Sequence, residues 1–501
     1  MQDLQSVLPE SIQFEPPSRA MMSTRRTVSI KPTTGNRTPT GATSSQDIVQ
    51  FRLPNSGVLA SCYLKGTMNI PSPTAGSDAT NSFACNQVVK DQFSAGSSWI
   101  RRMVVKASDG TELTNVNCYN KYCSIMNRLK NSKEYNESLG SIYDGGVRHT
   151  ADQVNVGFNS AVIDQTPTGD VAVGGLGISL HSGYELASKR LASSVTGDTF
   201  VHQFQTGVLD QSKDFMLPLA LLGSGLSLEL TCAEVGEVFR VCPSSASASL
   251  SANVLDAHPA TGATLSGYDI SDLELVVDIL YYPPELMASL SSKMCQGLKV
   301  VCDNVRQQQN AVPQQENTVI LSTHARSVKS IVCGVKNSSE SGNIRRDESS
   351  YYKYPGASGG GVSEVQFSIG SEQCPANPIK YGAQSLIELE KALQPIMGAD
   401  YKMGNQINSG NYNKQFKADT ASAGAGGAGE DTGSGLFGIN LQSHPEMPGV
   451  LSGKSASAGS ISMSCELRFS ATPVAEATLE TFVISDSVIE FLADGSALVS
   501  K

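Results

Sequence analysis

Two glycine-rich stretches have spacings that could support chemistry. The segment 356–360 (GASGG) matches the G-x-S-x-G pattern, in which a strained turn between a strand and a helix exposes a nucleophilic serine. Here that serine would be Ser358. A run typical of a strand, residues 362–369, follows in place of the helix, and the surroundings are rich in glycine. We therefore interpret the segment as a loop and expect no nucleophile at Ser358.

The second stretch, residues 449–455 (GVLSGKS), resembles a phosphate-binding loop but has one residue too few between its glycines. Such a loop holds phosphate because a helix begins directly after it, and the N-terminus of that helix favours anions. The residues that follow here alternate between polar and apolar, which predicts a strand. The stretch is thus expected to be a loop before a strand.

The histidines and cysteines lack the spacing of a metal site or a catalytic pair. None of the six histidines forms an HxH, HxxxH or HExxH pattern, and we interpret them as structural or exposed: His149, His181, His202, His258, His324 and His444. A Ser-His-Asp site stays open at this point, because its members need not be neighbours in sequence. The 11 cysteines are scattered and include no CxxC, so we expect reduced, mostly buried thiols in an intracellular setting. These patterns predict no catalytic residue, no metal site and no cofactor.

Three segments alternate between apolar and polar residues almost without error, as half-buried strands do. They are residues 226–232, 272–281 and 461–470. Strands with one wet face and one dry face belong to antiparallel sandwiches and not to buried parallel sheets. The turn sequence Ser-Asp-Gly at 108–110 adds a predicted hairpin. The sequence therefore predicts an all-β protein.

Helix signals are few. Apolar residues at helical spacing predict a helix over residues 122–129. Ser385 and Glu388 form a capping-box pattern for a second helix, which is expected to stop near Pro395. A third short helix is expected after Pro284, near the middle of the chain, where it would connect two domains.

Length and composition bound the number and kind of domains. A chain of 501 residues suggests more than one domain, and 40% apolar residues suffice for sizeable cores. Only 17% of the residues are charged and 46 are glycine, which suits short strands joined by exposed loops. The net charge of −10 argues against the coating of nucleic acid, since such a coat needs a basic face. We see no apolar run long enough for a membrane span and no signal-peptide pattern.

Two domains and a connection follow from these signals. Residues 27–285 and 299–501 each contain many strand signals, one good helix and long polar loops, so we expect two large β domains. Residues 286–298 would connect them. Strands do not alternate with helices along the chain, which disfavours a doubly wound α/β fold.

The first residues are expected to form an arm. Residues 1–26 have little periodicity and no core of their own. They carry Arg19, Arg25 and Arg26, which we interpret as contacts with a neighbouring molecule. The arm should become ordered only when that neighbour is present.

In order along the chain, several stretches resemble segments of the double jelly-roll major capsid proteins of polinton-like viruses, virophages and adintoviruses. The stretches are 27–32 (TVSIKP), 48–54 (IVQFRLP), 99–110 with 119–122 and 129–132, 215–219 (FMLPL) with 226–232, 377–379 (NPI) before the helix at Leu386, and 459–461 (GSI) before the strand that ends at Phe469. The resemblance covers most of the chain as an order of elements. It departs from the family at the turn, which reads Ser-Asp-Gly in place of Asn-Gly, and over residues 140–200.

The resemblance implies an all-β fold of two tandem jelly-roll barrels with a few short helices. It also implies a homotrimer whose six barrels form a pseudo-hexagonal capsomer in the icosahedral shell of a double-stranded DNA virus, assembled inside the host cell. Its partners would be neighbouring capsomers, penton and minor capsid proteins, and an inner membrane where one lies beneath the shell. The role would be structural and non-enzymatic, without sequence-specific binding of nucleic acid.

Two other functions stay open on the residues alone. A secreted or surface carbohydrate-binding β-sandwich would show a signal peptide, aromatic platforms and calcium-type Asp clusters, whereas this chain has one Trp and no such cluster. A hydrolase built on β-sandwiches is the third hypothesis. The size of the assembled particle distinguishes a shell protein from both.

Overall fold

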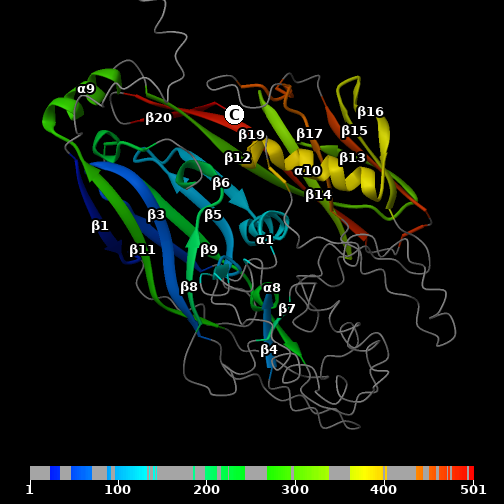
Figure 1. The fold of residues 1–501 in the computed structure, drawn as a ribbon, viewed down its shortest axis with the longest axis horizontal. Helices are drawn as coiled ribbons and strands as arrows, with labels where there is room; N and C mark the ends of the chain where they lie inside the picture. Colours follow the sequence, from blue (N-terminus) through cyan, green and yellow to red (C-terminus); the bar gives the residue numbers. More distant parts are fainter. Residues whose placement is uncertain are drawn as a thin grey trace, which may run out of the picture.

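In the computed structural model, the chain forms antiparallel sheets with a few helices (Figure 1). The structure describes residues 23–33, 47–69, 87–91, 96–132, 135, 139–140, 143, 184–186, 198–210, 216–223, 225–242, 268–294, 298–337, 362–398, 401–402, 436–443, 451–457, 462–470, 472–473, 477–492 and 496–500.

The first half of the chain forms two facing four-stranded sheets, of order β1-β11-β3-β8 and β2-β9-β5-β6. Their strands are β1 (Thr24–Ile30), β2 (Ile48–Arg52), β3 (Val58–Asn69), β5 (Ile100–Lys106), β6 (Glu112–Asn117), β8 (Asp198–Gln203), β9 (Ser227–Cys232) and β11 (Asp269–Tyr281). A third, small sheet of order β10-β4-β7 contains β4 (Gln87–Asp91), β7 (Tyr184–Leu186) and β10 (Phe239–Cys242). Leu64, Leu228 and Leu275 are fully buried in the core between the two larger sheets.

The second half repeats the strand order of the first. Its strands are β12 (Leu298–Ala311), β13 (Glu316–Leu321), β14 (Val328–Asn337), β15 (Val362–Ile369), β16 (Glu372–Lys380), β17 (Leu436–Asn440), β18 (Met463–Phe469), β19 (Ala477–Phe491) and β20 (Ala497–Ser500). The sheets have the order β12-β19-β14-β17, with β20 beside β19, and β13-β18-β15-β16. Without the small sheet of the first half and without β20, each half has eight strands. In both halves the first of these eight pairs with the last, and the second pairs with the seventh. Each half therefore has the eight strands and two sheets of a jelly roll.

Helix α9 (Pro284–Met294) lies between the two halves, where the sequence predicts a connecting helix. Among the described strands, those of each half pair only within that half. None of the α9 side chains with an assigned burial is buried, and Leu286 is 42% exposed. The helix joins the halves without packing into either core.

The start of β1 corrects the predicted boundary of the arm. The strand begins at Thr24, and Arg25 and Arg26 pair with residues of β11. Residues 24–26 carry no strand signal because β1 is an edge strand whose first residues are all exposed, so no apolar alternation marks its start. Residues 1–22 of the predicted arm lie outside the described residues.

The three segments with strict alternation are strands, as predicted: they are β9, β11 and β18. Burial alternates along β9 and β18, whereas in β11 all residues from Leu275 to Ile279 are buried. In β18, every second residue from Met463 to Phe469 is buried. The hairpin predicted at 108–110 is also confirmed, since β5 and β6 pair directly around it. Gly110 there has a φ of 86°, a left-handed conformation that favours glycine.

The predicted helices are α1 (Tyr119–Lys130) and α10 (Ala383–Met397), but the start predicted for the second is wrong. Its N-cap is Gly382, and Ser385 lies in the first turn, where its Oγ accepts a hydrogen bond from the Gly382 amide at 2.9 Å. The helix ends near Pro395, as predicted, but Pro395 lies inside the last turn. Gly398 stops it, since its φ of 107° is closed to most side chains.

Candidate functional site

Most of the chemical candidates from the sequence lie outside the described residues. These are Ser358 with its glycine-rich flanks, Arg19, and His149, His181, His258 and His444. The proposals attached to them stay predictions.

Lys454, from the stretch that resembles a phosphate-binding loop, is paired with a carboxylate. The described part of the stretch, 451–455, is irregular backbone with one β-bridge, as a loop before β18 should be. The Nζ of Lys454 forms an ion pair with Glu372 of β16 and donates a hydrogen bond to the Sγ of Cys374 at 3.1 Å. Desolvation would lower the pKa of Lys454, but these partners hold it above its ordinary value. The lysine therefore ties the loop to β16.

His202 is a buried structural residue. It lies on β8 inside the first core, and its Nε2 is 2.9 Å from the Oη of Tyr119 of α1. The same Oη accepts a hydrogen bond from the amide of Gln205 at 3.2 Å. Burial lowers the pKa of His202 to about 3, which keeps the imidazole neutral at neutral pH. His324, by contrast, is exposed.

Within the described ranges, no group of three or more His, Cys, Asp or Glu residues is placed to hold a metal ion. In the same ranges no helix has the length and apolar character to cross a membrane. Eight cysteines in these ranges are free, and all but the half-buried Cys118 are buried: Cys62, Cys118, Cys123, Cys232, Cys302, Cys333, Cys374 and Cys465. Free, mostly buried thiols are thus confirmed for these cysteines.

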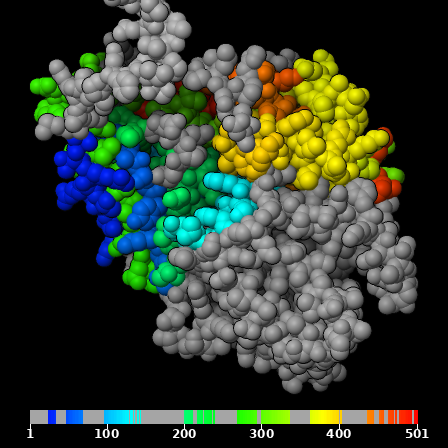
Figure 2. All heavy atoms as spheres, in the orientation of Figure 1, coloured from blue at the N-terminus to red at the C-terminus, as the bar shows by residue number. Residues whose placement is uncertain are grey.

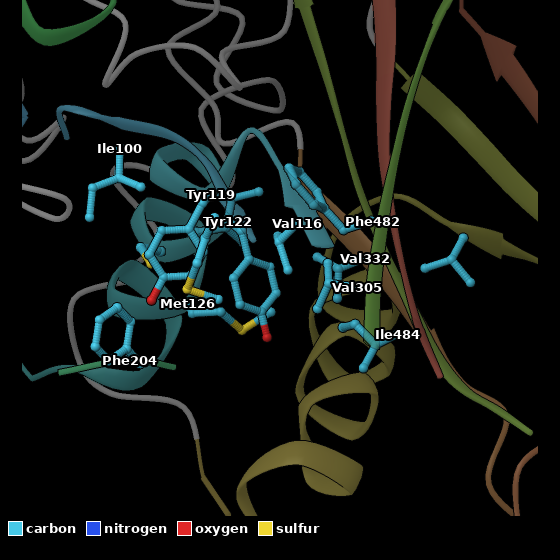
Figure 3. Close-up of a cluster of buried hydrophobic side chains, with 14 of the residues drawn as sticks. Ile100, Val116, Tyr119, Tyr122, Met126, Phe204, Val305, Val332, Phe482 and Ile484 are labelled. Atoms are coloured by element: carbon cyan, nitrogen blue, oxygen red, sulfur yellow. The ribbon is translucent and has the colours of Figure 1, made fainter. Parts of the chain in front are cut away.

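The two halves meet over the outer face of the sheet β12-β19-β14-β17, in a cluster that we call the junction: Val116, Tyr122, Val305, Val332 and Phe482 (Figure 3). Tyr122 comes from α1 and Phe482 from β19, and their ring centroids are 6.0 Å apart. All five side chains are at most 1% exposed. Since full burial of a large apolar side chain contributes roughly 1.5–3 kcal/mol, the junction holds the halves as one body.

A buried ion cluster lies on the same outer face. Asp303 of β12 and Asp486 of β19 stand directly opposite each other in the strand register, and Lys329 lies where β14 bulges against β19. The Nζ of Lys329 contacts the Asp303 carboxylate and is 3.3 Å from Asp486. Desolvation would lower the pKa of Lys329, but the two carboxylates raise it above its ordinary value. The lysine thus stays charged and separates two acids that would otherwise repel each other.

Two hydrogen bonds also connect the first half to the second. Thr206 of the first half donates its Oγ1 proton to the Asp303 carbonyl at 3.4 Å. Tyr401 of the second half donates to the carbonyl of Leu129 at 2.5 Å. The contact between the halves is therefore polar as well as apolar.

The hairpin turn between β5 and β6 reaches the second half as well. The carboxylate of Asp109 accepts a hydrogen bond from the amide of Ala497 of β20 at 3.1 Å. Burial tends to raise the pKa of Asp109, but the amides of Thr111 and Ala497 hold it below its ordinary value. The turn predicted from the sequence is thus also a contact between the halves.

A cavity of about 680 Å³ lies beside the junction, where the end of α1 approaches the end of α10. In Figure 2 the cyan surface of α1 adjoins the yellow surface of α10. The lining includes His202, Asp210 and Met397. His202 is no general base there, because its pKa is far below neutral pH.

Of the arginines predicted to contact a neighbour, Arg25 and Arg26 lie in β1. Arg25 forms an ion pair with Asp278 of β11, which also accepts hydrogen bonds from Thr27 (2.6 Å) and Ser61 (2.7 Å). Burial tends to raise the pKa of Asp278, but these donors hold it below its ordinary value. The Arg25 side chain is still 62% exposed. Arg26 is exposed on the other side of the strand, because neighbouring residues of a strand point to opposite faces.

No protein-family model and no curated protein matches the chain. Solved structures do match it. VP54 of PBCV-1, fitted into a cryo-EM reconstruction of the virophage Sputnik, aligns with a TM-score of 0.55 and 8% identity over 96% of this chain and 98% of that chain. The Faustovirus major capsid protein aligns with a TM-score of 0.55 and 10% identity over 97% and 94%. The 3.5 Å structure of the Sputnik virophage by cryo-EM aligns with a TM-score of 0.52 and 10% identity over 99% and 92%.

At such identities these matches show the fold. The chain has the all-β, double jelly-roll fold of viral major capsid proteins, and the fold class predicted from the sequence is confirmed.

Proposed function

We propose that the chain is the major capsid protein of an icosahedral double-stranded DNA virus, located in the virion shell and assembled inside the host cell. Three copies would form a pseudo-hexagonal capsomer of six barrels. The observation that carries this proposal is the repeated strand order in two halves that the junction holds as one body. A solved structure that shares the fold is named as a major capsid protein.

The proposed role is structural and non-enzymatic. The ion pair of Lys454 and the burial of the neutral His202 support structural roles for both residues. A carbohydrate-binding or hydrolytic β-sandwich is the alternative, and it would work as a monomer or small oligomer without forming shells.

The purified chain is expected to be a trimer at micromolar concentration. Two unlike barrels supply two unlike surfaces, and contacts between unlike surfaces close a ring. Size-exclusion chromatography with light scattering measures the mass, and electron microscopy shows whether trimers assemble into shells. A monodisperse monomer at this concentration would contradict the proposal.

Arg19, Arg25, Arg26 and the segment before β1 are proposed to contact neighbouring capsomers, penton or minor capsid proteins, or an inner membrane. Deleting residues 1–22 should leave trimers intact, since β1 begins at Thr24 and stays complete. The same deletion should impair shell formation. Shells of normal size and yield from the truncated chain, seen by electron microscopy, would show that the segment is dispensable.

A further inference from the structure

The ion cluster brings an amine and a carboxyl group into contact inside the protein. The Nζ of Lys329 contacts the Asp303 carboxylate, and the two side chains are only 7% and 3% exposed. The residues lie on β14 and β12, the two strands that flank β19 in the sheet. A lysine amine and an aspartate carboxyl group are the two components of an amide bond. The contact therefore places two reactants side by side.

A third group that can move protons stands beside this pair. Asp486 of β19 is 3.3 Å from the Nζ of Lys329 and lies directly opposite Asp303 in the strand register. Its carboxylate accepts a hydrogen bond from the Oγ of Ser327 at 2.7 Å, and its backbone amide donates to the Ser327 carbonyl at 2.9 Å. Asp486 is thus held in place within reach of the ammonium protons, as a general base has to be.

Both halves of the chain shield the cluster from water. Thr206 of the first half donates to the Asp303 carbonyl at 3.4 Å, and the Nζ of Lys329 donates to the Pro395 carbonyl of α10 at 3.5 Å. Loss of hydration costs each buried charge several kcal/mol. Such a site favours a reaction that turns two charged groups into neutral products, and the formation of an amide is a reaction of this kind.

We propose that Lys329 and Asp303 join in an isopeptide bond within the chain, with Asp486 as the general base. Asp486 takes a proton from the ammonium, and the lone pair of Nζ attacks Cγ of Asp303 to form the C–N bond. The bond from Cγ to one carboxylate oxygen breaks. That oxygen leaves as water with two of the three ammonium protons, one of them carried by Asp486. Asp486 ends as the carboxylate that it was, and no oxidant or cofactor takes part.

The bond is expected to form slowly. The two acids raise the pKa of Lys329, and only the neutral amine is a nucleophile. Fixed contact between the reactants offsets this, since it acts as a very high effective concentration. A newly folded chain therefore holds the ion cluster, and the bond accumulates as the protein ages. It would join β12 to β14 across β19, next to the contact with the first half.

Intact mass spectrometry of the wild-type chain, before and after long incubation at neutral pH, tests the inference. The mass should fall below that of the sequence by one water molecule. Lys329→Met should keep its sequence mass, and so should Asp486→Asn, which retains both reactants but lacks the base. Lys402→Met, which alters an exposed ion pair, is the matched control and should lose water as the wild type does. Circular dichroism checks that the variants are folded.

A peptide map of the wild type locates the bond without any variant. Trypsin releases residues 300–306 (VVCDNVR), which include Asp303. It does not cleave after an acylated lysine, so Lys329 should stay within residues 327–336 (SVKSIVCGVK). The two segments should appear as one branched peptide that lacks one water molecule. Reducing conditions exclude a disulfide between the cysteines of the two segments as the cause of the link.

Asp303→Asn identifies the acyl group. An amide at this position would release ammonia in place of water, so the incubated variant should lose the mass of one ammonia molecule. An unchanged wild-type mass after incubation, or a loss of water that maps to other residues, overturns the inference. Neither result bears on the proposed trimer or shell, which are tested by the mass of the assembled particle.

Discussion

Replacing Lys329 with methionine is expected to lower the free energy of unfolding by about 3–5 kcal/mol, because the change leaves two buried carboxylates without their cation. The side chains of Asp303 and Asp486 are only 3% and 9% exposed, and they face each other across β12 and β19. Methionine keeps most of the length and volume of the lysine, so the loss reports the charge. The measurement is the shift of the denaturant midpoint at constant protein concentration.

Lys402→Met is the matched control for this experiment. Lys402 is 77% exposed and pairs with Glu390 at 3.1 Å, so its loss should cost less than about 1 kcal/mol. A triple variant that combines Lys329→Met with Asp303→Asn and Asp486→Asn should recover part of the lost stability, since no buried charge is left. Equal midpoints for wild type and Lys329→Met would contradict the role given to the cluster.

Acidification from pH 6.5 to pH 5 should cost the wild type roughly 1.5 kcal/mol through His202 alone. Burial lowers the pKa of this imidazole to about 3, whereas in the unfolded chain it stays near its ordinary value of 6.5. Between these two values the unfolded chain binds more protons than the folded one, so acid favours unfolding. The contribution is complete above about pH 6.5 and is lost as the pH falls toward 3.

A His202→Phe variant tests this contribution. It also lacks the hydrogen bond to Tyr119, so the useful quantity is the change in unfolding free energy between pH 6.5 and pH 5 and not its absolute value. That change should be smaller in the variant than in wild type by roughly 1.5 kcal/mol. His324→Gln, at an exposed position, should behave as wild type. The same pH dependence in wild type and His202→Phe would show that the imidazole does not titrate as proposed.

Strands could be predicted from the sequence most reliably where one face of the strand is exposed to solvent. In β18, Glu466 and Arg468 are exposed between buried residues, so the alternation is visible in the residue types. In β19 the segment 477–487 is buried on one face by its own core and on the other by the first half. A strand buried on both faces has no alternation to read, and its strand character was missed.

The ion cluster could not be found from spacing. Its members come from three strands, and Lys329, which contacts both acids, lies where β14 bulges against β19. A weak signal exists, since Asp303 and Lys329 each lie within a short run of otherwise mostly apolar or uncharged residues. Such a position marks a charge that needs a partner, but it does not identify that partner. The order of residues along the chain therefore could not predict that Lys329 pairs with Asp303 and Asp486.

Helix α9 has a consequence for how the chain can vary. As a covalent link, it keeps the two halves at a high effective concentration. None of its side chains with an assigned burial is buried, so the junction, and not this helix, sets the orientation of the halves. Changes in the length or composition of this connection should be tolerated over evolution. Changes at Tyr122 or Phe482 have to be matched by a partner some 360 positions away. Selection for a fixed orientation of the two halves should therefore make Tyr122 and Phe482 change together. The sequence of α9, which links the halves, should vary more freely.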